Sequence, residues 1–171
     1  MVRHRGLTNY LCWARQRYGP EDGSVVSSSL CFDATVTSLL IPLIDGRAVR
    51  LLAEDRGIER LAEAVRAEAG CGLVKITPSQ LEVLGQRLLE EHSGSAASLI
   101  VIGGEALTPS TVELWRRIQP EVRLINEYGP TETVVGCVVY EIPDLAELGR
   151  RVPIGRPIAN TRIYLLDGHG E

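Results

Sequence analysis

The sequence predicts an α/β fold: a doubly wound, mostly parallel, flavodoxin-like sheet with helices on both faces. Short segments rich in Val, Ile and Leu alternate with longer segments whose apolar residues recur at helical spacing, which is the βαβα rhythm of a parallel sheet. One short segment, Leu99–Ile102, is apolar throughout, as is typical of a strand covered on both faces. The chain has 171 residues, of which 44% are hydrophobic, so it can bury a core of this kind.

The elements can be placed in chain order from local signals. Helices are expected at 7–18, from a cap at Asp33 or Thr35 to residue 44, at 58–69, at 78–91, and from Thr108-Pro109 onward. Strands are expected at 25–31, 47–53, 72–76, 99–102 and 122–125. Gly19-Pro20 ends the first helix, and Pro78 takes the first position of the fourth.

The rhythm changes after Glu132. The strand-like segments Gly136–Ile142 and Thr161–Leu166 have no helix of comparable length between them, and prolines interrupt the connection. We therefore expect an α/β subdomain over residues 1–135, with the pocket loops. Over 136–171 we expect a connection and the first strands of a β-rich second subdomain.

Composition argues against several classes of function. The net charge of −4 gives no electrostatic attraction to nucleic acid or to an anionic membrane. No apolar run approaches the roughly 18–20 residues that cross a bilayer, and the polar, basic start does not resemble an export signal. The four cysteines lack C-x-x-C spacing, which favours reduced thiols over a disulfide framework. We expect a cytoplasmic protein.

Polar or glycine-rich segments follow four of the predicted strands, and ligands of open α/β sheets bind at that edge. The richest of these segments is Asn126–Glu132. Tyr128 offers a flat face to a nucleobase and Asn126 can bond a base edge. Thr131 and Glu132 suit a phosphate oxygen and its Mg²⁺. From this chemistry alone, a turn with a core tyrosine is an equal alternative.

Resemblance to a known family favours the nucleotide site. Asn126–Glu132 reads NEYGPTE, which resembles the fifth core motif of nonribosomal peptide synthetase adenylation domains, in the AMP-forming ligase superfamily. Phe32–Thr35 resembles the fourth core motif, and Gly103–Leu107 resembles the adenine-side loop. Val152–Thr161 is similar to the segment that follows, and Val2–Leu7 to the stretch after the phosphate-binding loop. Order and spacing agree over essentially the whole chain.

The resemblance implies roles on the nucleotide side. Tyr128 would stack on adenine, while Asn126 and Gly104 would help to define the adenine pocket. Thr131 would contact the α-phosphate and Glu132 would bind Mg²⁺, which makes these two the expected catalytic residues.

The resemblance also implies an amino-acid pocket. Asp33 would pair with the α-ammonium group of the substrate, although it could also serve as a helix cap. The side-chain pocket would be formed by Ala34, Thr37, Lys75, Val101, Gly103, Glu127, Val135 and Gly136. Lys75 and Glu127 could approach each other across the pocket, which would leave little net charge. A hydrophobic substrate would leave both groups unpaired, at about 1–3 kcal/mol each.

Asparagine fits this pocket because its side chain both donates and accepts, and the set resembles the family's asparagine-type pocket. Aspartate is the runner-up, since Lys75 would attract it and Glu127 would repel it. A β-hydroxylated asparagine could use the room left by Ala34. A surface ion pair between Lys75 and Glu127 is the alternative without a pocket.

The implied reaction joins an amino acid to the α-phosphate of ATP with Mg²⁺. The family then passes the acyl group to phosphopantetheine on a peptidyl carrier domain. The lysine-containing phosphate loop, the ribose-binding aspartate and a C-terminal lysine are not found in these residues. We therefore expect an internal piece of an adenylation domain, which needs the rest of that domain and is inactive alone. An acyl- or aryl-acid ligase and a non-catalytic nucleotide-binding module are the rival interpretations.

Overall fold

The computed structural model describes residues 1–19, 22–53, 57–67, 71–95, 97–143 and 148–170. Its helices are α1 (His4–Tyr18), α2 (Thr35–Ile44), α3 (Gly57–Arg66), α4 (Pro78–Glu90), α5 (Pro109–Ile118) and the short 3₁₀ helix η2 (Thr131–Thr133). Its strands are β1 (Ser24–Val26), β2 (Val49–Leu51), β3 (Leu73–Ile76), β4 (Leu99–Gly103), β5 (Arg123–Tyr128), β6 (Val138–Glu141) and β7 (Arg156–Pro157). Within this described part, no helix has the length and apolar character needed to span a bilayer.

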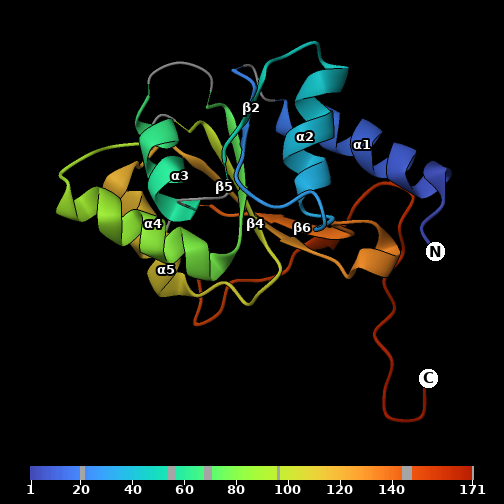
Figure 1. The fold of residues 1–171 in the computed structure, drawn as a ribbon. Coiled ribbons are helices and arrows are strands. Elements are labelled where there is room, and N and C mark those ends of the chain that lie inside the picture. Colours follow the sequence, from blue (N-terminus) through green and yellow to red (C-terminus); the bar gives the residue numbers. More distant parts are fainter. Residues whose placement is uncertain (20–21, 54–56, 68–70, 96, 144–147, 171) are drawn as a thin grey trace.

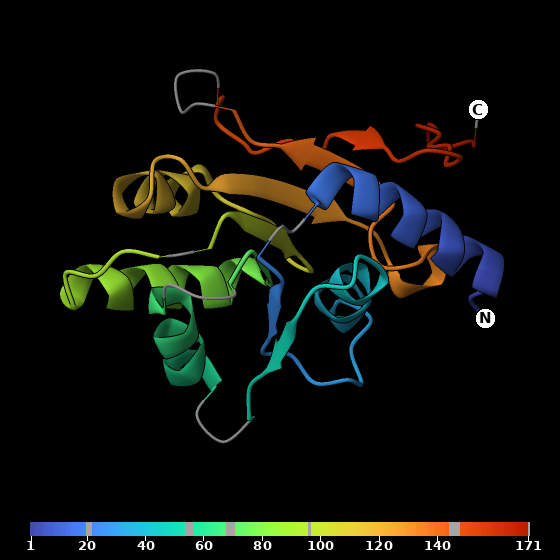
Figure 2. The ribbon, with the colours of Figure 1, turned by 90° about the horizontal axis from the view of Figure 1, so that it is seen from above.

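The described strands form one seven-stranded sheet in the order β2-β1-β3-β4-β5-β6-β7. Neighbours from β2 to β5 are parallel, whereas β6 runs antiparallel to β5 and β7 runs antiparallel to β6. Helices α1 and α2 cover one face of the sheet, and α3, α4 and α5 cover the other (Figure 1 and Figure 2). The predicted α/β class, with a mostly parallel sheet and helices on both faces, is confirmed.

Each face of the sheet has its own apolar core. On the α1/α2 face, Tyr10 and Ile41 pack with Val101 of β4. On the α3–α5 face, Leu84 and Trp115 pack with the alternate residues of the same strands. Because successive strand residues point to opposite faces, each central strand contributes to both cores.

Two helix starts agree with the sequence signals and one does not. Thr77 forms a capping box with Gln80 at the start of α4, and Thr108 caps α5 by accepting from the backbone N–H of Thr111. The predicted side-chain cap of α2 by Asp33 or Thr35 is wrong. The residue before α2 is Ala34, and no side chain caps it.

Two strand ends differ from prediction. β1 ends at Val26 rather than at residue 31, so Asp33 follows a loop of turns and bends. β5 extends to Tyr128 rather than ending at residue 125, because residues 125–128 pair with β6. Asn126, Glu127 and Tyr128 are therefore strand residues held in a ladder rather than loop residues, which fixes the directions of their side chains.

The segment after Glu132 stays in the same sheet for longer than predicted. β6 and β7 extend the sheet beyond β5, so the prediction that the chain leaves the sheet at Gly136 is wrong for residues 138–141 and 156–157. Residues 161–166, predicted as a strand, adopt neither helix nor strand, and the large side chains from Ile163 to Leu166 are exposed. A second subdomain beginning in these last residues stays a prediction.

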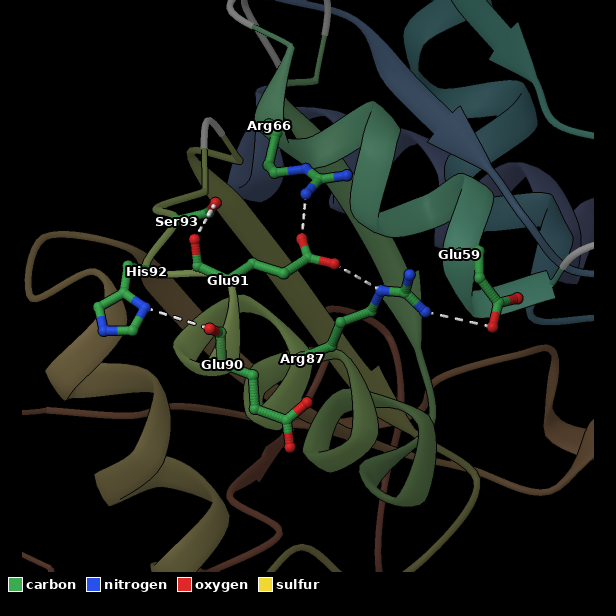
Figure 3. Close-up of polar contacts among 7 residues, drawn as sticks. All are labelled: Glu59, Arg66, Arg87, Glu90, Glu91, His92 and Ser93. Carbon is green, nitrogen blue, oxygen red and sulfur yellow. Dashed lines mark hydrogen bonds and ion pairs between the residues drawn. The ribbon is translucent and has the colours of Figure 1, made fainter.

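A chain of ion pairs joins α3 to the end of α4 (Figure 3). The Arg87 guanidinium lies 3.2 Å from Glu59 of α3 and 3.0 Å from Glu91, and Arg66 of α3 also pairs with Glu91. These side chains are partly exposed, so each pair contributes about 0–1 kcal/mol at most. The network links α3 to α4 on the face opposite α1 and α2.

The core makes a testable prediction at Trp115, which is 0% exposed and donates its indole N–H to Leu81 O at 2.9 Å, from α5 to α4. Trp115→Phe removes this bond and leaves a void, so we expect the free energy of unfolding to fall by roughly 1–3 kcal/mol. Urea unfolding followed by circular dichroism measures the change. Trp13→Phe, at the half-buried tryptophan of α1, is the control and should lower it by less than half as much.

Candidate functional site

A buried ion pair lies on the α1/α2 face of the sheet. Lys75 of β3 pairs with Glu127 of β5, and their side chains are 6% and 0% exposed. The strand between them, β4, has Gly103 directly beside Glu127. A Cβ on Gly103 would lie 2.5 Å from Glu127 O and 3.0 Å from Lys75 Nζ. A side chain at residue 103 would therefore clash with the Glu127 backbone and crowd the Lys75 ammonium. Burial rules out the alternative of a surface ion pair.

Two tyrosines of α1 hold the carboxylate of this pair. Tyr10 Oη lies 2.9 Å from Glu127 Oε1, and Tyr18 Oη lies 2.6 Å from the same oxygen. Tyr10 Oη also lies 2.6 Å from Thr37 Oγ1 of α2. Burial, followed by the negative charge of Glu127, raises the pKa of both phenols well above the ordinary value of 10. Both therefore stay neutral hydrogen-bond donors at physiological pH.

The sequence analysis missed Tyr10 and Tyr18 as site residues. Their spacing in α1 places them on one face of the helix, with Ala14 between them. A buried tyrosine hydroxyl normally has a hydrogen-bond partner. This tyrosine face was the available signal, but the sequence did not show that it packs against the strand carrying Glu127.

The segment after η2 closes the other side of Glu127. A Cβ on Gly136 would overlap the carboxyl carbon of Glu127, so only glycine fits there. Val134 and Val135 before it have φ of 69° and 54°, which is strained for β-branched residues. Val135 packs in the same apolar cluster as Val101.

The structure thus brings together most of the predicted pocket. The members joined through direct contacts or shared packing are Thr37, Lys75, Val101, Gly103, Glu127, Val135 and Gly136. Asp33 and Ala34 lie half-buried at the start of α2. The negative charge of Asp33 adds to the rise in the pKa of Tyr10, after burial and Glu127, so Asp33 belongs to the same electrostatic environment.

A cavity of about 760 Å³ opens at the carboxyl end of β4 and β5 and is lined by all three predicted adenine residues. Gly104 and Tyr128 lie at its edge, and Tyr128 is 50% exposed, so its ring can receive a flat base. Asn126 lines the same cavity and donates from Nδ2 to Pro153 O at 2.8 Å. Arg150 and Arg151 also line it, and the sequence analysis did not predict them.

The predicted catalytic pair lies apart from this cavity. Thr131 and Glu132 are both exposed on η2. Glu132 lines a second cavity, of about 650 Å³, together with Arg3, Arg5 and Asn160, and Thr131 lines neither. No cluster of three or more metal-ligating side chains occurs among the described residues. One exposed carboxylate still fits Mg²⁺, which is usually held by one or two carboxylates plus substrate phosphates.

The raised phenol pKa values give a testable pH dependence. The folded pKa lies above the unfolded one, so the stability that these phenols contribute is present below pH 10 and is lost as pH rises towards the folded values. Tyrosinate absorbance at 295 nm should show Tyr10 and Tyr18 ionising only as the protein unfolds. If all five tyrosines ionise reversibly near pH 10 while the circular dichroism stays native, the assignment is wrong.

Comparison with known proteins agrees with this geometry. The family model described as "AMP-binding enzyme" matches residues 1–171. The chain is 38% identical to bacitracin synthase 3 of Bacillus licheniformis and 35% identical to tyrocidine synthase 3 of Brevibacillus parabrevis. Those alignments cover 100% and 98% of this chain but only 3% of each relative.

The solved structures that superpose on this chain are also nonribosomal peptide synthetases. The crystal structure of the nonribosomal peptide synthetase FmoA3 superposes with a TM-score of 0.87 and 29% identity, over 98% of this chain and 18% of that chain. A four-domain nonribosomal peptide synthetase bound to AMP and glycine gives 0.82 and 28%, over 99% of this chain and 12% of the other. The chain belongs to the AMP-binding enzyme family, and within it is similar to the adenylation segments of nonribosomal peptide synthetases.

Proposed function

We propose that this chain forms the amino-acid-selecting part, and much of the adenine-binding part, of an adenylation domain. The observation that supports the proposal is the buried pair of Lys75 and Glu127, two of the residues that the family resemblance assigns to the side-chain pocket. The cavity with Gly104, Asn126 and Tyr128 lies beside it. Glu127 also lines that cavity, so a molecule joining an amino acid to a nucleotide could occupy both regions.

In the proposed reaction a carboxylate oxygen of the amino acid attacks the α-phosphorus of ATP. The bond from that phosphorus to the bridging oxygen breaks, and pyrophosphate leaves with the electron pair. Asp33 pairs with the α-ammonium group and Tyr128 stacks on the base, which together align the two reactants. Thr131 contacts the α-phosphate. Glu132 holds Mg²⁺, which supplies positive charge to the phosphates.

The proposed amino acid is asparagine. Lys75 and Glu127 are both buried, and an alkyl side chain placed against them would leave the remaining Lys75 hydrogens and the remaining lone pair of Glu127 Oε2 without partners. A carboxamide offers an acceptor to the ammonium and a donor to the carboxylate. Aspartate is less favourable because its second oxygen would face Glu127. Ala34 leaves room for a substituent such as a β-hydroxyl.

The aminoacyl-adenylate is proposed to pass to the phosphopantetheine thiol of a carrier domain, where the thiol displaces AMP. An acyl- or aryl-acid ligase fits less well, since its substrate has no ammonium group to pair with Asp33. The rest of the adenylation domain supplies further phosphate contacts in this proposal. The function is therefore best tested in a complete domain that contains this chain.

The test is amino-acid-dependent exchange of pyrophosphate into ATP, with asparagine, aspartate, glutamine and phenylalanine as substrates. Asparagine should lead, and Asp33→Ala should reduce kcat/KM by at least about 100-fold because it removes the partner of a buried charge. Asp45→Ala is the matched control. Asp45 follows the other end of α2 and pairs with Arg15 at the surface, so exchange should change less than twofold.

The outcomes separate the parts of the proposal. Another leading amino acid would refute asparagine but keep amino-acid activation. Exchange that depends equally on des-amino acids would favour the acyl- or aryl-acid ligase. No exchange from a well-folded complete domain that still binds ATP would refute the proposed function and favour a non-catalytic nucleotide-binding module.

A further inference from the structure

We propose that Tyr10 and Tyr18 are positioning residues that set the side-chain selectivity of the amino-acid pocket, by occupying one carboxylate oxygen of Glu127. The inference rests on the proposed function and adds two residues to it. Neither tyrosine belongs to the pocket positions implied by the family resemblance. Both come from α1, more than 100 positions before Glu127 in the chain.

The Glu127 carboxylate accepts three hydrogen bonds from protein side chains. Oε1 of Glu127 accepts from Tyr10 at 2.9 Å and from Tyr18 at 2.6 Å, which fills both of its lone pairs. Oε2 accepts from Lys75 Nζ. Only Oε2 retains a lone pair, so any donor on a substrate must approach Glu127 from the side of Lys75.

The hydrogen bond from Tyr10 to Glu127 fixes the direction of the neighbouring bond between Tyr10 and Thr37. A phenol has one hydrogen, and Tyr10 gives it to Glu127, because an ionised carboxylate can only accept. The hydroxyl of Thr37, 2.6 Å from Tyr10 Oη, must therefore donate to it. Thr37 is 0% exposed. A chain of hydrogen bonds thus runs from Thr37 through Tyr10 to Glu127 Oε1, and with the bond from Tyr18 it leaves no free lone pair on that oxygen.

Lys75 and Glu127 keep hydrogen-bonding capacity that a substrate side chain can use. Lys75 has three hydrogens and gives one to Glu127 Oε2. The groups left over are donors on Lys75 and one acceptor site on Oε2, side by side. A carboxamide presents an acceptor and a donor in the same arrangement. A carboxylate offers two acceptors, one of which meets Oε2, and an ammonium side chain meets Lys75 with like charge.

The tyrosines are what make this arrangement specific. Without them Oε1 would be a buried, unsatisfied carboxylate oxygen, and it could turn towards Lys75 and take up the donors that the substrate needs. The shape around the pair would hardly change, because phenylalanine fills the same ring volume. Tyr→Phe exchange therefore removes the hydrogen bonds to Oε1 while keeping the packing of the rings.

The experiment compares kcat/KM for asparagine and aspartate in the complete adenylation domain, with the KM for ATP measured in parallel. The double variant Tyr10→Phe, Tyr18→Phe should lower the asparagine-to-aspartate ratio by about tenfold or more, with the KM for ATP within twofold. Tyr140→Phe is the matched control. Tyr140 lies in β6 and packs with the core of the opposite face, so it should leave the ratio unchanged.

Several results would overturn the inference. The inference is wrong if the asparagine-to-aspartate ratio of kcat/KM in the double variant stays within twofold of the ratio in the unaltered domain. It is also wrong if the variant loses kcat/KM equally for both amino acids and loses affinity for ATP to the same extent, because equal losses indicate a purely structural role. If the double variant does not fold, Tyr18→Phe alone must lower the ratio in the same direction. Preference of the unaltered domain for an alkyl amino acid would refute the carboxamide but keep amino-acid activation. Loss of all exchange in the unaltered domain would refute the proposed function itself.

Discussion

The rest of the site depends on the cost of burying Lys75 and Glu127 together. Removing two charges from water costs several kcal/mol per ion unless each is paired and hydrogen-bonded. The surrounding residues meet that requirement. Gly103 and Gly136 leave space for the pair, and Tyr10 and Tyr18 donate to the carboxylate. A site that already balances its own charge favours a neutral, polar substrate, which is the chemical basis of the asparagine proposal.

Successive side chains of β5 point to opposite faces of the sheet, and this strand connects the amino-acid region and the adenine region of the proposed active site. Glu127 points to the α1/α2 face, while Asn126 and Tyr128 on either side of it line the cavity of about 760 Å³. Pairing with β6 continues β5 through these residues, so one rigid strand sets the distance between the amino-acid and adenine regions. After η2, the strained backbone at Val134 and Val135 brings Gly136 directly beside the side chain of Glu127.

Sequence reasoning predicted the fold class and the order of the elements because strand and helix periods are local properties. Motifs whose spacing resembles a known family also singled out a set of residues most of which lie together in the structure. Sequence reasoning did not predict that β5 continues through Asn126, because that extension depends on pairing with β4 and β6. Tyr10 and Tyr18 were missed for a similar reason, since their partner lies far away in the sequence. Non-local contacts of this kind have no local signature.

If Lys75 and Glu127 stabilise one another inside the protein, the effects of replacing them are coupled. A double-mutant cycle with Lys75→Met and Glu127→Gln, measured by urea unfolding of the 171-residue chain, determines this coupling. Each single variant leaves a buried charge without its partner and should lower the free energy of unfolding by roughly 3–5 kcal/mol. The double variant should be at least ~1–2 kcal/mol more stable than the sum of the single effects predicts. Additivity within about 0.5 kcal/mol would contradict this coupling.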